Sequence, residues 1–243
     1  MTAIETRGLT KRFGTFTAVD HLDLTVEEGE LFALLGVNGA GKTTAIRMLT
    51  CLLPPTEGTA LVLGHDICAE TAAVKAVTDV SPQETAVARQ LTVRENLLLM
   101  AGLYGADKAE AEKRADELIS VFELEEVRAK RAKTLSGGMQ RRLSIAMALV
   151  SRPKVLFLDE PTLGLDVLAR RGLWKLICEL KGSVTIILTT HYLEEAEALS
   201  DRIAILSKGS LCACGTPEAL KTLAGTESFE EAFIALAAGK EAL

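Results

Sequence analysis

A glycine-rich loop that ends in lysine and threonine carries the most evident chemistry in the sequence. The string Gly36-Val-Asn-Gly-Ala-Gly41-Lys42-Thr43 follows the spacing G-x-x-x-x-G-K-[ST]. Its glycines let successive backbone N–H groups converge on a polyphosphate, and the following helix start adds positive potential. Lys42 supplies a charge for the β- and γ-phosphates, and the Thr43 hydroxyl is a hard oxygen of the kind that Mg²⁺ prefers. The alternative is a tight glycine turn before a helix. The predicted nucleotide-binding loop comprises Gly36, Val37, Asn38, Gly39, Ala40, Gly41, Lys42, Thr43 and Thr44.

Two carboxylates follow a short apolar run farther along the chain. Val155–Leu158 leads directly into Asp159 and Glu160. Beside a phosphate loop, a carboxylate at the end of a buried strand is expected to hold Mg²⁺, and Asp159 has that place. Glu160, one residue on, is expected to accept a proton from the water that attacks the γ-phosphate. The alternative is an ordinary polar strand end.

A second potential phosphate-binding helix start lies far from the first in sequence. In Leu135-Ser-Gly-Gly-Met-Gln140, Ser136 is a plausible N-cap and the glycines leave backbone donors exposed. Two such helix starts in one chain suggest a dimer, with each nucleotide between the loop of one copy and this helix of the other. His191, after the run Ile186–Thr190, can contact a γ-phosphate and orient water, although a lone histidine is more often structural.

The elements that must position these residues alternate between strand and helix. Continuous apolar or β-branched runs predict buried parallel strands, and a helix is predicted over Thr43–Cys51. The first thirty residues and Thr59–Leu63 instead resemble short antiparallel strands. The fold class predicted is therefore α/β: a P-loop NTPase core with a mainly parallel sheet, an antiparallel β edge and an inserted helical subdomain. The predicted buried strands are Leu31–Leu35, Val155–Leu158 and Thr185–Leu188.

The middle of the chain shows helical periodicity and no convincing strand. Acidic residues predominate over 107–126, where we expect a solvated face, and basic residues over 127–158, around the glycine pair. After Gly225, Phe229, Phe233 and Leu236 share a helix face that is expected to pack on the domain. The predicted helices of the middle are Thr92–Tyr104, Lys108–Phe122 and Met139–Val150. The domain prediction is a single unit over 1–243, with a core at 1–83 and 151–224, a helical subdomain at 84–150 and a tail at 225–243.

Composition limits the class of protein. The 243 residues are 48% hydrophobic and 25% charged, as in ordinary globular proteins, and the net charge of -6 argues against nucleic acid as a partner. The five cysteines are expected to be reduced thiols of a cytosolic protein, and Cys212 and Cys214 to alternate along a strand. The longest uncharged apolar runs reach about half the length of a membrane-spanning helix, so membrane contact is expected through a partner.

Taken together, these motifs and their order resemble those of ATP-binding-cassette (ABC) ATPases, the nucleotide-binding subunits of ABC transporters. In that resemblance, Phe13 corresponds to the aromatic residue that stacks on adenine, where many members have tyrosine. Gln83 corresponds to the Q-loop glutamine, which reaches Mg²⁺ and reports to the membrane subunit. Asp159 and Glu160 correspond to the Walker B pair, and His191 to the switch histidine. The signature motif would place Ser136, Gly137, Gly138 and Gln140 on ATP, and Gly164–Asp166 resembles the D-loop.

The resemblance implies an ATPase that dimerises around two ATP–Mg²⁺ and drives transport through separate integral membrane permease subunits. Ser81–Glu84, Leu91–Asn96 and Gly215–Glu218 are similar to exporter-type bacterial cassettes. The implied location is cytoplasmic, peripheral on the inner face of the cell membrane. Two alternatives remain: a soluble ABC-family ATPase that acts on ribosomes, DNA or iron–sulfur assembly, and a regulatory nucleotide-binding protein without turnover.

An apolar run begins the helical insert and suggests where a permease would dock. Leu97–Met100 with Leu103 and Tyr104 covers more than half of a helix circumference. We expect part of this run to line an exposed groove for a short cytoplasmic helix of a membrane subunit. The alternative is a helix that is fully buried within the insert.

Overall fold

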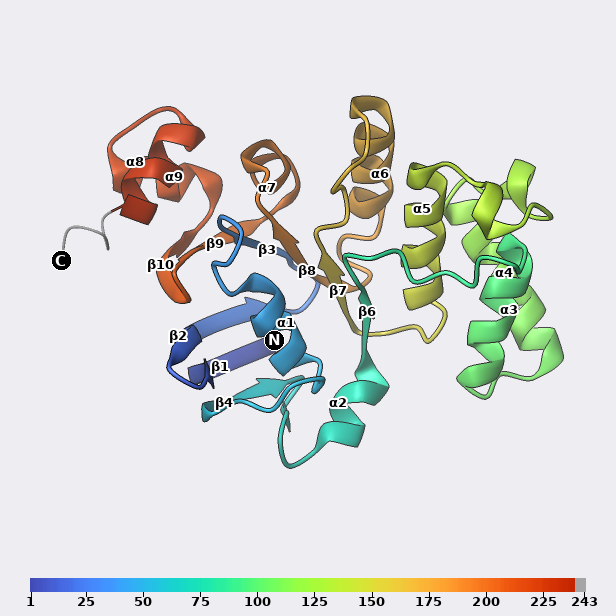
Figure 1. Ribbon diagram of the computed structural model, residues 1–243, viewed down its shortest axis with the longest axis horizontal. Helices are drawn as coiled ribbons and strands as arrows, with labels where there is room; N and C mark the ends of the chain where they lie inside the picture. The colour runs from blue at the N-terminus through green and yellow to red at the C-terminus, as the bar shows by residue number, and fades with distance from the viewer. Residues whose placement is uncertain (239–243) are drawn as a thin grey trace.

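The chain folds around two β-sheets with helices between and beside them (Figure 1). The computed structural model describes residues 1–238. The larger sheet has the strand order β10-β9-β3-β8-β7-β6, parallel except for the antiparallel pair β9–β10. Its strands are β3 (Leu31–Leu35), β6 (Thr78–Ser81), β7 (Val155–Asp159), β8 (Thr185–Thr190), β9 (Arg202–Ser207) and β10 (Ser210–Gly215).

The buried strands of this sheet are the ones that the apolar runs predict. Every residue of β3, β7 and β8 is buried, because helices and the second sheet cover both faces. The polar ends Asp159 and Thr189 extend the predicted strands and remain within the ladder, since Asp159 pairs with Thr189. Residues 78–81 were not predicted as a strand; β6 is too short to show a period and contains Asp79. Cys212 and Cys214 do alternate along β10.

The smaller sheet is antiparallel, as expected for the N-terminal segment, with the order β2-β1-β4-β5. Helix α1 (Lys42–Leu49) packs between the two sheets, where Ala45, Ile46, Met48 and Leu49 join a core cluster formed by strands of both. This packing fixes the direction of the α1 axis relative to the strand ends. The strands of this sheet are β1 (Thr2–Phe13), β2 (Phe16–Glu27), β4 (Glu57–Val62) and β5 (His65–Asp66).

Three helices form the segment at the far side of the larger sheet (Figure 1). They are α3 (Val93–Leu103), α4 (Lys108–Val121) and α5 (Gly137–Ala148). Each begins at a side-chain N-cap, from Thr92, Asp107 and Ser136 respectively, and Thr92 forms a capping box with Glu95. Among the described residues 92–150, the only β contact is an isolated bridge between Thr92 and Arg131, so the helical prediction is confirmed.

The acidic side chains of this segment are mostly exposed, as the expectation of a solvated face predicts, and some of them also form ion pairs. Asp116 pairs with both Arg94 and Arg128, at 3.3 and 2.9 Å. Glu123 lies 2.6 Å from Arg142. The acidic and basic stretches therefore compensate one another across the helical segment, because folding places α4 beside the start of α3 and the loop before α5.

The remaining helices cover the larger sheet and its C-terminal edge. The tail prediction is confirmed for the described residues, since Phe229 is buried and Phe233 and Leu236 pack against the cluster around β9. Residues 239–243 lie outside the described part. These helices are α2 (Thr71–Val77), α6 (Val167–Glu179), α7 (Leu193–Leu199), α8 (Pro217–Ala224) and α9 (Phe229–Ala238).

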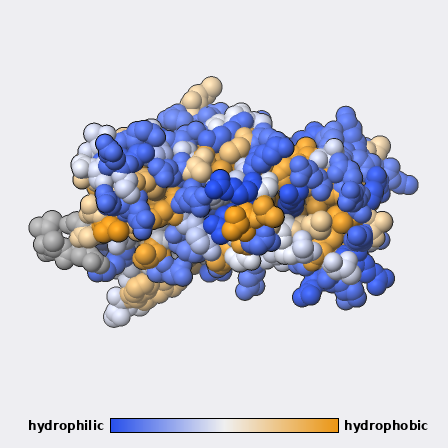
Figure 2. Space-filling view, turned by 90° about the horizontal axis from the view of Figure 1, so that it is seen from above, coloured by the Kyte–Doolittle hydropathy of each residue, from blue (hydrophilic) through white to orange (hydrophobic). Residues whose placement is uncertain are grey.

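One face of the molecule is mostly hydrophilic, with apolar patches that remain separate. Figure 2 shows this on the face seen from above. Within residues 1–238, no helix combines the length and the hydropathy needed to span a bilayer. Large apolar side chains that are nevertheless exposed include Leu103, at 72%, and Leu168, at 85%.

Candidate active site

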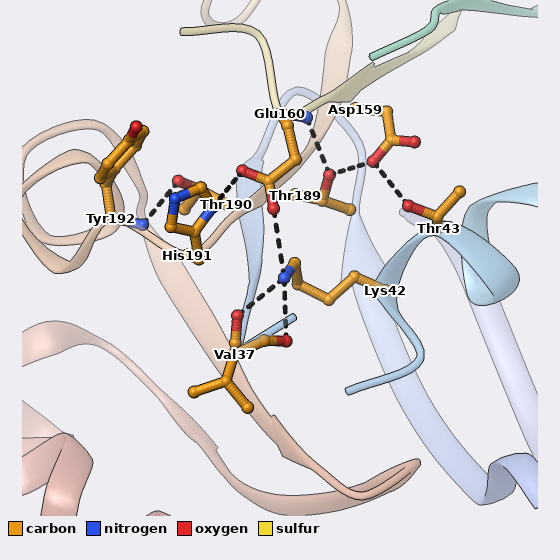
Figure 3. A network of polar contacts seen from close by, with 10 residues as sticks. Val37, Lys42, Thr43, Asp159, Glu160, Thr189, Thr190, His191 and Tyr192 are labelled. Carbon is orange, nitrogen blue, oxygen red and sulfur yellow. Dashed lines mark hydrogen bonds and ion pairs between the residues drawn. The ribbon is translucent and has the colours of Figure 1, made fainter. Parts of the chain in front are cut away.

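The predicted loop, carboxylates and histidine meet at one edge of the larger sheet. Strands β3, β8 and β7 are neighbours and parallel, so the segments that follow them share one edge (Figure 3). The segments after the carboxyl ends of such strands are where α/β proteins bind ligands. A pocket of about 440 Å³ opens there. It is lined by Phe16, Ala18, Asn38, Gly39, Ala40, Gly41, Lys42, Thr43, Thr44, Gln83, Glu160, Leu163 and His191.

The glycine loop presents the start of α1 to this pocket. Gly41 is the N-cap, with φ 101°, and a Cβ there would collide with the carbonyl oxygen of Ala18. Only glycine therefore fits this turn beside β2. The first intrahelical donor is the N–H of Ala45, which donates to the Gly41 carbonyl at 2.9 Å. The N–H groups of residues 42–44 precede it, so they can turn toward an anion at the helix start.

Lys42 is buried at the centre of the site, with 6% of its surface exposed. Its Nζ donates to the Gly36 carbonyl oxygen at 2.7 Å and to the Val37 carbonyl oxygen at 3.3 Å. The same Nζ lies 3.2 Å from Glu160 Oε1. The loop carbonyls and one carboxylate therefore fix the ammonium in place, which directs a single positive charge into the pocket.

Asp159 receives two hydroxyl donors on the same oxygen. Thr43 Oγ1 lies 3.1 Å and Thr189 Oγ1 lies 2.5 Å from Asp159 Oδ1. This carboxylate is buried, at 5% exposed, and both hydroxyls come from segments that the sheet and α1 hold rigidly. The result is a cluster of hard oxygen atoms beside the phosphate loop. Thr189 is a member that the sequence did not single out.

Glu160 contacts both basic side chains of the pocket. Its Oε2 lies 2.7 Å from His191 Nδ1, and its Oε1 faces Lys42. The backbone of Glu160 has φ 48°, a left-handed conformation that is uncommon for a residue other than glycine. Its N–H donates to the carbonyl and the hydroxyl of Thr189, which stabilises this turn. Strained backbone of this kind concentrates at functional sites.

His191 and Gln83 reach the pocket from two different segments. His191 follows β8, and its ring lies against that of Tyr192, with centroids 4.1 Å apart. Gln83 follows β6, the strand next to β7, and is therefore brought to the same edge as Glu160. The structure thus brings together the loop, Asp159, Glu160, Gln83 and His191.

The signature residues do not line this pocket. Ser136 is exposed at the start of α5, and its Oγ accepts the N–H of Met139 at 3.3 Å. Gln140 turns its amide back to the Leu135 carbonyl, at 3.0 Å. Gly138 packs against α6, since a Cβ there would lie 3.0 Å from Ala169 Cβ. Within one chain, the two predicted phosphate-binding helix starts therefore stay apart.

An aromatic residue that the sequence did not single out lies at the pocket beside the one that the resemblance implies. Phe16 lines the pocket, whereas Phe13 is outside the lining and half exposed, with Lys11 Nζ 5.4 Å from its ring centroid. The two phenylalanines are partners across the turn between β1 and β2. Sequence reasoning missed Phe16 because it relied on the motif Lys-Arg-Phe-Gly. It also missed Leu163, which lines the same pocket.

A buried carboxyl group lies behind the catalytic edge. Glu195, on α7, is fully buried, and its Oε1 accepts the N–H of Trp174 from α6 at 2.9 Å. Burial is the main cause that raises the pKa of Glu195; the nearby hydroxyls of Thr190 and Thr162 and the hydrogen bond from Trp174 oppose the rise, and the charge of Glu160 adds to it. No sequence signal marked this residue, because a Glu among the other glutamates of a short helix is ordinarily a surface residue.

Comparison with known proteins identifies the class. Residues 19–163 match the family model described as "ABC transporter". The "Daunorubicin/doxorubicin resistance ATP-binding protein DrrA" of Streptomyces peucetius is 47% identical over 225 residues, which cover 92% of this chain and 68% of that protein. The human "Retinal-specific phospholipid-transporting ATPase ABCA4" is 45% identical over 209 residues, which cover 86% of this chain and 9% of that protein.

Solved structures agree in fold. The "Structure of ATP binding subunit of ABC transporter" has a TM-score of 0.85 and 31% identity, covering 97% of this chain and 99% of that one. A dimeric ATP-binding cassette in a post-hydrolysis state, bound to ADP and Pi, has a TM-score of 0.78 and 27% identity, covering 88% of this chain and 98% of that one. The chain belongs to the ABC transporter family, as an ATP-binding and ATP-hydrolysing subunit. The predicted fold class and ATPase activity are thereby confirmed, and a non-transport ABC ATPase is not favoured.

Proposed function

We propose that ATP is hydrolysed in the pocket formed by the glycine loop, Glu160, Gln83 and His191. The backbone N–H groups of the loop and the Lys42 ammonium bind the phosphates. Glu160 accepts a proton from the attacking water, and His191, which contacts Glu160 at 2.7 Å, orients that carboxylate and the γ-phosphate. Phosphate drawn to Lys42 competes with Glu160 for the same ammonium, so substrate binding releases Glu160 Oε1 toward water.

The residues around Asp159 fit a magnesium ion. Mg²⁺ in nucleotide sites is held by one or two carboxylates and hydroxyls, with phosphates and waters completing its shell. Thr43 and Asp159 supply such oxygens 3.1 Å apart, and Gln83 adds an amide oxygen at the same pocket. When bound, the ion neutralises charge that develops on the phosphates.

We propose that the working unit is a dimer with ATP at both interfaces. Ser136 and Gly137 are exposed and Gly138 is partly buried at the start of α5, which the chain's own pocket does not use. Val167 and Leu168, at the start of the neighbouring helix α6, are 65% and 85% exposed. Apolar side chains beside free backbone donors suit a face that a second copy covers. The relative that is dimeric and bound to ADP and Pi supports the formation of a dimer.

We also propose that a membrane permease docks on α3. Leu97 is fully buried, so the run is in part core. Leu99 and Leu103 on the same helix, however, are 45% and 72% exposed, and Tyr104, its C-cap, is 50% exposed. These residues form an apolar surface near β6, because Tyr104 donates to Asp79 at 2.6 Å. A cytoplasmic permease helix that binds there would lie close to the segment carrying Gln83.

Export is the direction that the relatives support. The bacterial relative is named for resistance to daunorubicin and doxorubicin, and the human relative for phospholipid transport. We propose that this chain powers export of an amphipathic compound through separate permease subunits, from the cytoplasmic face of the membrane. A related cassette, 25% identical, is described as part of a transporter complex.

One observation carries the catalytic proposal: Lys42 and His191 both contact the buried Glu160 inside the pocket. The test is steady-state ATP turnover by the purified chain and by Lys42→Ala. We expect wild-type turnover that requires Mg²⁺ and a variant with none above background. Loss of the ammonium also weakens ATP binding, because a hydrogen bond to a charged group contributes about 1.5–3 kcal/mol. Normal turnover by the variant would refute this site.

A further inference from the structure

A buried arginine on α5 binds the backbone of the segment that carries Gln83. Arg141 has 4% of its surface exposed. Its Nη1 donates to the Pro82 carbonyl oxygen at 2.6 Å, and its Nη2 donates to the Gln83 carbonyl oxygen. The guanidinium thus bridges two consecutive carbonyl groups with the two ends of its fork. A planar donor of this shape fixes orientation as well as distance.

A second contact lies one helical turn farther along the same face of α5. Ser144 Oγ is 3.1 Å from Ser81 Oγ, and both hydroxyls are buried. Residues 141 and 144 are three apart and face the same side of the helix. The adjacent Arg142 points elsewhere, to Glu123 at 2.6 Å, inside the helical segment. The segment 81–83 is therefore attached to one specific face of α5.

The burial and charge of Arg141 show that few other side chains could replace it in this contact with the backbone. Burial lowers the pKa of Arg141, whereas the negative charge of Asp159 opposes that shift and favours the cation. The guanidinium donates to these two backbone carbonyl groups. Removing the side chain would leave these carbonyls without their donors in a part-buried place, which carries a desolvation penalty.

We propose that Arg141 is a positioning residue that makes the Gln83 segment and the start of α5 move as one body. This inference rests on the proposed dimer. In it, Gln83 lies at the nucleotide bound by its own chain, and Ser136 faces the nucleotide bound by the partner copy. Arg141 lies between these two points, so it transmits the occupancy of one site to the other. Its loss should reduce cooperativity between sites and leave binding to a single loop intact.

The experiment compares Arg141→Met, Arg141→Lys and the control Arg142→Met in the full chain. Steady-state ATPase rates are measured against ATP concentration, and nucleotide binding by calorimetry. For Arg141→Met we expect a Hill coefficient near one, a lower kcat, and an affinity for the second ATP weakened by about 5- to 150-fold, the usual range of coupling between binding sites. The calorimetric affinity for the first ATP should stay close to wild type. Arg141→Lys, which can reach one carbonyl, should be intermediate, and Arg142→Met should keep wild-type cooperativity.

A double-mutant cycle separates this role from a merely structural one. If Arg141 acts through Gln83, the effect of Gln83→Ala on kcat should shrink in the Arg141→Met background. Additive effects, or unchanged kcat and Hill coefficient in folded Arg141→Met, would overturn the inference. If Arg141→Met does not fold, Arg141→Lys decides, and full wild-type cooperativity there overturns it. A wild-type chain without ATP-dependent dimerisation would instead refute the proposed function.

Discussion

Replacing Glu160 with glutamine tests the proposed chemistry with the smallest change in shape. In the structure, Oε1 of Glu160 lies 3.2 Å from Lys42 Nζ and Oε2 lies 2.7 Å from His191 Nδ1. The amide of glutamine keeps one acceptor, which can still face Lys42. It places an NH₂ group toward His191, so the imidazole must accept there instead of donating. The amide cannot take a proton from water.

Glu160→Gln should change the ATPase rate, the free energy of unfolding and the ATP affinity by different amounts. A general base contributes about 10²- to 10⁴-fold, which is about 3–5 kcal/mol in activation free energy at 1.36 kcal/mol per decade. At an effective dielectric constant of 20, the bare attraction between Lys42 and Glu160 is about 5 kcal/mol, and the desolvation of both groups offsets much of it. We therefore expect a loss of about 1–3 kcal/mol in the free energy of unfolding. ATP affinity should not fall, because Lys42 is released from a competing carboxylate.

Three measurements on the purified Glu160→Gln variant check these expectations. Turnover of Mg-ATP should fall by about 10²- to 10⁴-fold. The ATP affinity measured by calorimetry should equal or exceed that of wild type. With ATP bound and not cleaved, the dimer should accumulate, which size-exclusion chromatography with Mg-ATP detects.

Glu194→Gln is the matched control, because that carboxylate pairs with Arg171 at the surface. It should change neither turnover nor the elution volume. The reasoning is refuted if Glu160→Gln turns over at the wild-type rate, or if it binds ATP and stays monomeric at high protein concentration.

Three further predictions follow from other parts of the molecule. Ser136→Arg should abolish ATPase activity and retain ATP binding, and its mixture with Lys42→Ala should recover about one active site per mixed dimer; a mixture no more active than either variant contradicts the composite site. Leu103→Glu should leave basal ATPase activity intact and reduce co-purification with membranes that contain the permease; unchanged co-purification places the docking surface elsewhere. Glu195→Gln should become more stable relative to wild type as pH rises above 4.5, the ordinary pKa of the group, because a raised folded pKa gives stability at low pH that is lost on ionisation. Urea unfolding across pH 4.5–8 measures this, and a pH-independent difference contradicts it.

The phosphate loop and the strands around it could be predicted because their signals are local. β3 consists of five apolar residues, and Gly36 follows it directly. The glycine spacing from Gly36 onward is compatible with few structures other than a phosphate-binding loop. Asp159 and Glu160 follow the apolar run of β7 in the same way. When strands are parallel, their ends meet at one edge, so the sequence also predicts that the carboxylates approach the loop.

The positions of Phe16 and Glu195 could not be predicted, because they depend on contacts between distant segments. Phe16 reaches the pocket because the turn after β1 places it there and leaves Phe13 outside. Glu195 is buried because α7 packs beside α6, where Trp174 donates to it. The short strand β6 could not be predicted for the same reason. It forms because it pairs with β7, whereas its own amino-acid composition does not favour a strand.

The contacts inside the helical segment determine which groups can bind an anion at the start of α5. Sequence alone associated the glycine pair with a basic stretch, but Arg128 and Arg142 are committed to Asp116 and Glu123. Arg141 is committed to the backbone near Gln83. Within α5, the N–H of residue 140 is the first that donates to a backbone carbonyl, that of Ser136. The N–H groups of residues 137 and 138 precede it, so in the proposed dimer we expect backbone donors, more than these arginines, to bind the partner's phosphate. Replacing these arginines with neutral residues should therefore alter the free energy of unfolding or the coupling between sites more than it alters anion binding at this helix start.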